Sequence, residues 1–201
     1  MSDQSEKLIE LDLERPIWDS FFNVYPLVVI GTKEPDGTDD LAPKHLAIPV
    51  SWENFFGFVC TPKHRTYQNI VRTQQFTVTY ARPTQVVLAS LAATPRCEDG
   101  SKPIVDQLPT IPAKDVDAVL MKDGYLFLEC TLHKIYDDFG NNSLITGRIL
   151  SARIANDALR IADGDDQQLL QQAPLLAYLY PGRFAEISNT QKMPLPKGFK
   201  R

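Results

Sequence analysis

The stretch TPKHRTYQNI, residues 61–70, has the types and spacing of a charged helix start. Thr61 is a favourable N-cap residue and Pro62 suits the first helical position, so the helix is expected to begin here. The next three residues can carry positive charge: Lys63, His64 and Arg65. Free backbone N–H groups and the helix dipole already make this end positive, so each added cation costs about 0.3–1 kcal/mol.

A bound anion would reverse that cost. A charge-assisted hydrogen bond to an anion stabilises by about 1.5–3 kcal/mol, which exceeds the penalty for one cation in the first turn. Thr66 adds a hydroxyl donor, and Tyr67, Ile70 and Val71 follow at the spacing of a buried helical face. The residues fit two interpretations, a solvated helix start or an anion-binding site, and the second makes the sharper prediction.

Other catalytic and metal-binding patterns fail on spacing. The histidines, His45, His64 and His133, form neither an i, i+4 pair nor an H-E-x-x-H motif, so no metal site is expected. Ser90 lies in ASLAA rather than in a nucleophile elbow, and the acidic turns lack the spacing of a calcium loop. We therefore name no catalytic side chain.

A second cluster combines aromatic and cationic side chains in YLYPGRFAEI at 178–187. Its members are Tyr178, Tyr180, Arg183 and Phe184. Such residues stack on a planar ring, cover a partner subunit, or simply pack with Arg183 in solvent. The sequence leaves these three interpretations open.

The elements expected to position these residues are mainly strands. Segments that are β-branched or alternating, bounded by turn residues, predict six strands. They span residues 25–32, 45–52, 55–60, 75–81, 124–138 and 142–157. Polar turns join the second strand to the third and the fifth to the sixth as hairpins, and short connections favour a barrel or a sandwich.

Helical patterns are limited to the charged segment and to residues 84–93, 113–122 and 165–172. Residues 94–112 carry four prolines, Pro95, Pro103, Pro109 and Pro112, and are expected to form an irregular surface excursion. The helices are therefore expected to lie at the periphery of a sheet.

Composition excludes several classes of protein. With 201 residues, 43% of them hydrophobic and 23% charged, the chain fits one globular domain. A net charge of −4 gives no domain-wide positive field, so neither nucleic acid nor a membrane surface is an expected partner. The longest apolar runs are far short of about 20 residues, and the acidic first twenty residues lack the apolar core of a signal peptide. Cys60, Cys97 and Cys130 form no C-x-x-C pair, so we expect reduced thiols and a cytoplasmic location.

Four motifs follow one another along the first half of the chain. They are Gly31-Thr32, Asp40-Leu41-Ala42-Pro43-Lys44-His45, Thr66-Tyr67-Gln68-Asn69-Ile70 and Gln74-Gln75-Phe76-Thr77-Val78. In this order the chain resembles the flavin reductase-like family of FMN-binding split barrels. The family has a strand ending in Gly-Thr, an Asn-Leu-Ala-Pro-x-Ser type segment, a Thr-x-x-Asn-Ile helix and a Gly-Glu-Phe-x-Val strand. The resemblance covers about residues 20–187.

The resemblance implies a mainly β split β-barrel with a few peripheral helices. It implies one domain over residues 1–201, with a core at about 20–187 and an extension at each end, and a homodimer. FMN would place its phosphate against the helix start at residues 61–66, and its isoalloxazine ring would pass the Leu41-Ala42-Pro43-Lys44 segment. The implied FMN-binding residues are Thr32, Leu41, Ala42, Pro43, Lys44, Thr61, His64, Arg65 and Thr66. Asp40, Lys44 and His45 depart from the family pattern.

The resemblance also implies an activity: an NAD(P)H-dependent flavin reductase that passes electrons through FMN to a downstream acceptor. Such chemistry belongs to the isoalloxazine, so the protein supplies orientation and electrostatics and needs no acid or base of its own. Two alternatives remain. One is a non-enzymatic flavin-binding or electron-carrier protein, and the other is a pyridoxamine-phosphate-oxidase-like protein, because related barrels share phosphate sites of this kind.

Overall fold

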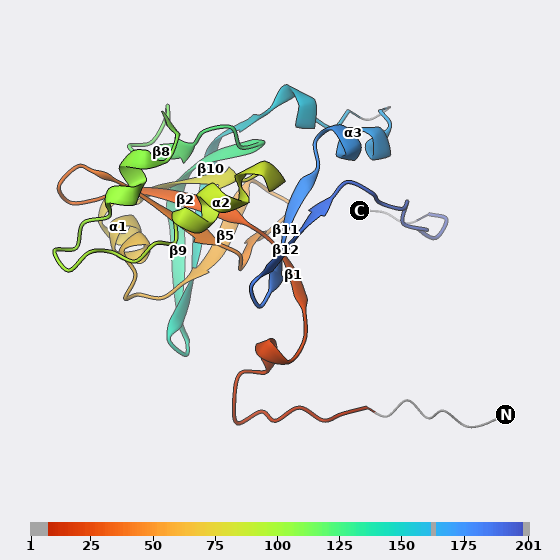
Figure 1. The fold of residues 1–201 in the computed structure, drawn as a ribbon, viewed down its shortest axis with the longest axis horizontal. Coiled ribbons are helices and arrows are strands. Elements are labelled where there is room, and N and C mark those ends of the chain that lie inside the picture. The colour runs from red at the N-terminus through yellow and green to blue at the C-terminus, as the bar shows by residue number, and fades with distance from the viewer. Residues whose placement is uncertain (1–7, 162–163, 199–201) are drawn as a thin grey trace.

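The computed structural model describes residues 8–161 and 164–198, built round one antiparallel seven-stranded sheet (Figure 1). Its strand order is β3-β2-β6-β9-β10-β5-β4. The strands are β2 (Val28–Lys33), β3 (Asp39–Lys44), β4 (Ala47–Pro49), β5 (Phe55–Cys60), β6 (Gln75–Tyr80), β9 (Leu126–Phe139) and β10 (Asn142–Ile154). Only His45 and Leu46 separate the two edge strands β3 and β4, so the sheet curls back on itself. The predicted mainly β split barrel is confirmed.

The core explains why the strand at β2 reads as a continuous apolar run. Val28, Val29 and Ile30 are all fully buried, although successive residues of a strand point to opposite faces. Val28 and Ile30 join one hydrophobic cluster with Phe56 and Phe58 of β5, whereas Val29 joins a second cluster with residues of β3 and residues that follow β6. The sheet is therefore packed on both faces at this point.

Smaller elements surround the sheet. Strands β1 (Asn23–Pro26), β11 (Leu175–Tyr180) and β12 (Arg183–Ile187) form a three-stranded sheet, and β7 (Thr110–Pro112) pairs with β8 (Val119–Met121). The helices are α1 (Arg65–Thr73), α2 (Val86–Leu91) and α3 (Asp166–Gln172). Short 3₁₀ turns occupy Ile17–Ser20, Pro83–Gln85, Pro103–Gln107 and Asn156–Ala158. Among the described residues, no helix combines the length and apolarity needed to span a membrane.

Helix α1 ends on Gln74, whose φ of 60° lies in the left-handed region that favours glycine. The family pattern has glycine at this position. The Gln74 backbone N–H donates to the carbonyl of Ile70, and its carbonyl accepts from the N–H of Leu132 on β9. These bonds hold the unusual backbone and turn the chain directly into β6.

Local signals located most of the elements. The strands predicted at 55–60 and 75–81, the long hairpin at 124–138 and 142–157, and the helices at 84–93 and 165–172 are confirmed, with shifts of a few residues at their ends. Asp165 caps α3 by accepting the N–H groups of Gln167 and Gln168. The second and third predicted strands pair antiparallel as β4 and β5, although β4 is only three residues long.

The helix predicted at 113–122 is wrong. The buried Glu129 carboxylate of β9 accepts the backbone N–H groups of Lys114 and Asp115, and β8 then pairs with β7. These partners lie outside the segment, so tertiary contacts override its helical pattern.

Two strand predictions are also wrong. The strand predicted at 25–32 is divided at Leu27, because β1 joins the small sheet and β2 the large one. The strand expected at 45–52 is preceded by β3, which begins at Asp39, paired with Lys33, and is absent from the six predicted strands.

Candidate functional site

The charged segment begins its helix later than the sequence predicts. Helix α1 starts at Arg65 with His64 as its cap, so the expected cap at Thr61 is wrong. The carbonyl of Thr61 accepts the N–H of His64 at 3.0 Å, which closes a four-residue turn with Pro62 at its second position. Proline favours that position because the turn needs its fixed φ. The turn aims the chain into the helix.

The later start of α1 still presents free N–H groups that could bind an anion. The first helical hydrogen bond runs from the N–H of Gln68 to the carbonyl of His64, so the preceding N–H groups of the first turn have no helical acceptor. The His64 side chain makes no capping hydrogen bond. Thr66 is 2% exposed, and no hydrogen bond of its hydroxyl occurs within residues 8–161 and 164–198.

A cavity of about 410 Å³, here called the cationic pocket, opens at this helix start. It is lined by Asp40, Ala42, Pro43, Lys44, Lys63, His64, Arg65, Thr66, Ala92, Ala93, Thr94, Arg96 and Lys102. The structure therefore brings together two predicted segments, the end of β3 and the start of α1. The predicted residues that line it are Ala42, Pro43, Lys44, His64, Arg65 and Thr66.

Three other predicted residues do not line the cationic pocket. Thr32 is fully buried, and its hydroxyl accepts a hydrogen bond from the Asn69 side chain at 3.1 Å. Leu41 is also fully buried, and its carbonyl accepts from the Lys102 ammonium at 2.7 Å. Thr61 lies in the turn before the helix. Thr32 and Leu41 thus contact residues that stabilise the pocket walls.

Sequence reasoning missed the contribution of the 94–112 excursion. Lys102 donates to the carbonyls of Leu41 and Ala92, both at 2.7 Å, and lies 3.3 Å from the Asp40 carboxylate. Arg96 lies 2.9 Å from Asp40. These contacts bind the excursion to β3 and to the end of α2. The prolines showed only that the segment is irregular, and no local signal pairs it with a strand some sixty residues earlier.

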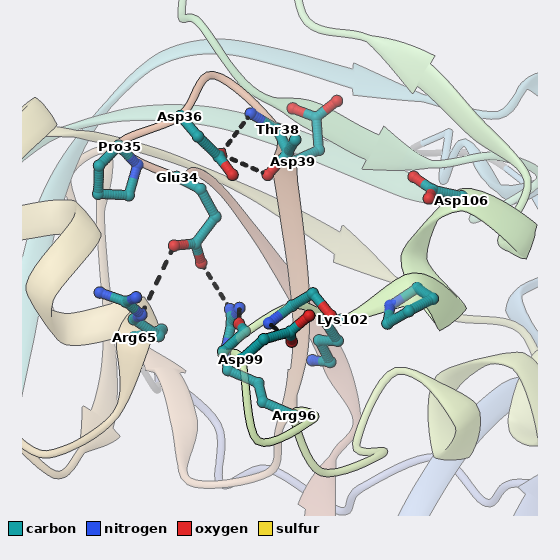
Figure 2. Close-up of a pocket in the computed structure, with 13 residues that line it drawn as sticks. Glu34, Pro35, Asp36, Thr38, Asp39, Arg65, Arg96, Asp99, Lys102 and Asp106 are labelled. Atoms are coloured by element: carbon teal, nitrogen blue, oxygen red, sulfur yellow. Dashed lines mark hydrogen bonds and ion pairs between the residues drawn. The ribbon is translucent and has the colours of Figure 1, made fainter.

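A neighbouring hollow of about 340 Å³ shares three cations with the cationic pocket: Arg65, Arg96 and Lys102. Figure 2 shows Glu34 between the helix start and the excursion. The Glu34 carboxylate is buried and lies 2.5 Å from Arg96 and 3.6 Å from Arg65, and it also accepts from the Asn69 amide at 3.0 Å. Glu34 and Asp40 therefore orient these cations.

The cationic pocket is positive after all pairs are counted. Its permanent cations are Lys44, Lys63, Arg65, Arg96 and Lys102, and Asp40 is its one carboxylate among the described lining residues. Lys44 and Lys63 form no ion pair within the described parts of the chain. Burial, and secondly the nearby Lys44, lower the pKa of His64, so its imidazole is neutral at pH 7 and adds no charge.

The donor set fits a phosphate group. A helix start supplies free N–H groups and the positive end of a dipole, and Lys and Arg side chains supply charge-assisted hydrogen bonds. Thr66, which is 2% exposed and carries a hydroxyl donor, lines the same cavity. Within the described residues, no group of three His, Cys, Asp or Glu side chains is arranged to hold a metal ion.

The family model described as "Flavin reductase like domain" matches residues 22–186. The chain belongs to the flavin reductase-like family. The predicted resemblance is confirmed, and the chain is a flavin-dependent oxidoreductase of the split-barrel fold. A comparison with curated proteins found no match.

Several solved structures share the fold of this flavin reductase-like chain. A flavoredoxin from Methanosarcina acetivorans has 16% identity and a TM-score of 0.75, with 96% of this chain and 97% of that chain covered. The flavoredoxin of Desulfovibrio vulgaris has 17% identity and a TM-score of 0.74, covering 95% and 100%. An NADH:FAD oxidoreductase of Streptomyces globisporus has 14% identity and a TM-score of 0.67, covering 83% and 88%. At these identities the likeness shows the fold alone.

Proposed function

We propose that this flavin reductase-like protein binds FMN and acts as an NAD(P)H-dependent flavin reductase that supplies electrons to a downstream acceptor. The observation that carries the proposal is the cationic pocket at the start of α1. The helix start and its group of cations form a phosphate site, which the single phosphate of FMN would occupy. When bound, the flavin supplies the hydride and electron chemistry.

The chain's own residues bind and orient. Arg65, Thr66 and the first-turn N–H groups of α1 would hold the phosphate, with Lys44 and Lys63 as unpaired cations at the same pocket. Neutral His64 would donate a hydrogen bond without further charge. Ala42 and Pro43 line the pocket from β3 and offer the ring an apolar, mostly backbone surface. Lys102 fixes that strand through the carbonyl of Leu41.

An anaerobic titration tests the activity. We expect FMN-loaded protein to lose its flavin absorbance when NADH or NADPH is added, and to regain it when air is admitted. Retained absorbance with both nicotinamides would contradict a reductase and favour the non-enzymatic electron carrier. Bleaching by pyridoxamine phosphate instead of a nicotinamide would favour the pyridoxamine-phosphate-oxidase-like alternative.

We also propose that the protein is a homodimer. Apolar side chains are exposed round the β4–β5 turn, with Ile48 at 56% and Trp52 at 97%, beside a hollow lined by Phe55, Tyr136 and Leu144. Exposed apolar groups that cluster in this way are typical of protein interfaces. Light scattering of the eluting protein is expected to give twice the chain mass, and Trp52→Glu to give a monomer while Leu159→Glu stays dimeric. A wild-type monomer would contradict the proposal.

Two further proposals concern context. We place the activity in the cytoplasm, where reduced nicotinamides are available and where Cys60, Cys97 and Cys130, all free in this fold, stay reduced. We take the whole chain as one domain with a core at about residues 20–187. Limited proteolysis that leaves this core intact, and cuts only the extensions, would support that organisation. An early cut within the core would contradict it.

A further inference from the structure

A third cavity, here called the aromatic pocket, is lined by residues of α2, of the end of β3 and of the β11–β12 hairpin. Its volume is about 520 Å³, within the range of about 300–1,000 Å³ that small-molecule sites occupy. Leu27, Val86, Val87 and Phe184 form apolar walls, and Ala89 leaves the helix side open to a flat molecule. Tyr178 adds an aromatic face.

The aromatic pocket has one charged side chain among its described lining residues, Arg183. The lining also contains the imidazole ring of His45, which packs among Tyr25, Tyr178 and Tyr180 with ring centroids 5.5, 4.8 and 5.6 Å away. Burial, and secondly Lys44, lower the pKa of His45 below its ordinary 6.5, so this imidazole is neutral at pH 7. No carboxylate occurs among the described residues of this lining, in contrast to the hollow beside Glu34.

Arg183 lines the aromatic pocket from the first residue after the turn between β11 and β12. Pro181 and Gly182 connect β11 to β12, and the Tyr178 hydroxyl accepts the N–H of Gly182 at 3.0 Å. Arg183 forms no ion pair within residues 8–161 and 164–198. Its guanidinium is therefore available to a ligand, and the turn that carries it is fixed by a residue of the same pocket.

The aromatic pocket adjoins the cationic pocket. Pro43 and Ala93 line both cavities. A molecule in the aromatic pocket would therefore contact two residues, Pro43 and Ala93, that also line the site at the start of α1.

We propose that the aromatic pocket binds a planar aromatic molecule that carries one anionic group, with Arg183 holding the anion and Tyr178, Phe184 and Val87 contacting the ring. Aromatic and apolar walls favour a flat ring, and a single unpaired guanidinium selects one negative charge. That such a ligand is the second substrate of a bound flavin rests on the proposed function. Binding itself rests only on the pocket.

Calorimetric titration with three simple probes tests the ligand class. Benzoate is planar and anionic, benzyl alcohol is planar and neutral, and cyclohexanecarboxylate is anionic but not planar. We expect benzoate to bind more tightly than either of the others. Absence of benzoate binding, or equal binding of all three, would overturn the proposal.

Variants locate the site. Arg183→Gln is expected to weaken benzoate binding about fivefold, the size of one charge pair at an exposed position, and to leave benzyl alcohol unchanged. Arg15→Gln, which removes a cation on the N-terminal extension, is the matched control and should bind as wild type. Val87→Glu should abolish benzoate binding, because a carboxylate on the wall repels the anion. Leu91→Glu puts the same charge on α2 outside the pocket lining and should bind normally. Equal losses in the two α2 variants, or none in Arg183→Gln, would refute the assignment.

Titrations with and without FMN separate this inference from the proposed function. We expect benzoate to bind both to the protein alone and to the FMN-loaded protein. Benzoate binding by a protein that ignores FMN would leave the aromatic pocket standing and remove the flavin proposal. FMN binding without benzoate binding would support the flavin proposal and remove the aromatic pocket. Competition between FMN and benzoate would overturn the second-substrate role.

Discussion

Removal of two donors from the start of α1 is the sharpest perturbation of the cationic pocket. The double variant Arg65→Ala, Thr66→Ala takes away the guanidinium and the hydroxyl of two residues that line the same cavity. It leaves the backbone N–H groups of the turn in place. We expect FMN binding to weaken, and riboflavin binding, which involves no phosphate, to stay the same.

The size of the loss follows from the environment of each side chain. The Arg65 side chain is 43% exposed and lies 3.6 Å from Glu34, so solvent and that carboxylate reduce its contribution to about 1 kcal/mol. Thr66 is 2% exposed, and its hydrogen bond to a charged group contributes about 1–1.5 kcal/mol. Together the two changes cost about 2 kcal/mol or more, which is a loss of about thirtyfold in affinity.

Quenching of flavin fluorescence during titration with protein measures both affinities. Arg72→Ala is the control, because it removes a cation from the last turn of the same helix and lies outside the cationic pocket. Unchanged FMN affinity in the double variant would refute the reasoning. So would wild-type protein that binds riboflavin as tightly as FMN, and the helix start would then be a solvated surface.

Three further predictions concern stability. The folded structure holds the pKa of His45 below its ordinary 6.5, so His45 binds a proton more readily in the unfolded chain. Acid therefore favours unfolding: Tm should fall as pH drops from 7.5 to about 5.5, and should fall less steeply in His45→Gln. A slope that does not change in the variant would contradict this. The buried Glu129 carboxylate accepts two backbone N–H groups and Arg153, so Glu129→Ala should cost about 2 kcal/mol or more in urea unfolding. An added Cβ at Gly31 would meet the carbonyl oxygen of Val119, so Gly31→Ala should cost about 3 kcal/mol or prevent folding, and a normal urea midpoint would contradict the packing.

The sequence predicted the elements whose partners are close along the chain. The hairpin of β9 and β10 carries its own turn chemistry, and Gly140 adopts a φ of 64° at its tip. The strand at 55–60 is bounded by polar residues and ends where the charged segment begins. Such signals are local, so they survive in any fold that contains them.

One failure depends on distant partners, and the other on a local turn. The helix predicted at 113–122 becomes β8 because Glu129 and β7 capture its backbone. The cap predicted at Thr61 is wrong because residues 61–64 form a turn with Pro62 at its second position, and the helix begins only after that turn.

The same distinction applies to the candidate site. The types of its residues at 42–44 and 64–66 were readable from the motifs, and the structure brings them to one cavity. The role of Arg96 and Lys102 was not readable, because it depends on ion pairs with Glu34 and Asp40 across the fold. The pairing of His45 with the tyrosines of the β11–β12 hairpin was hidden for the same reason.

The binding of FMN itself is the central claim, and an absorption spectrum tests it most directly. Purified protein is mixed with FMN, separated from free flavin by gel filtration, and scanned across the visible range. We predict a yellow protein that carries flavin absorbance through the column. A colourless protein that releases all of the added FMN would contradict the account.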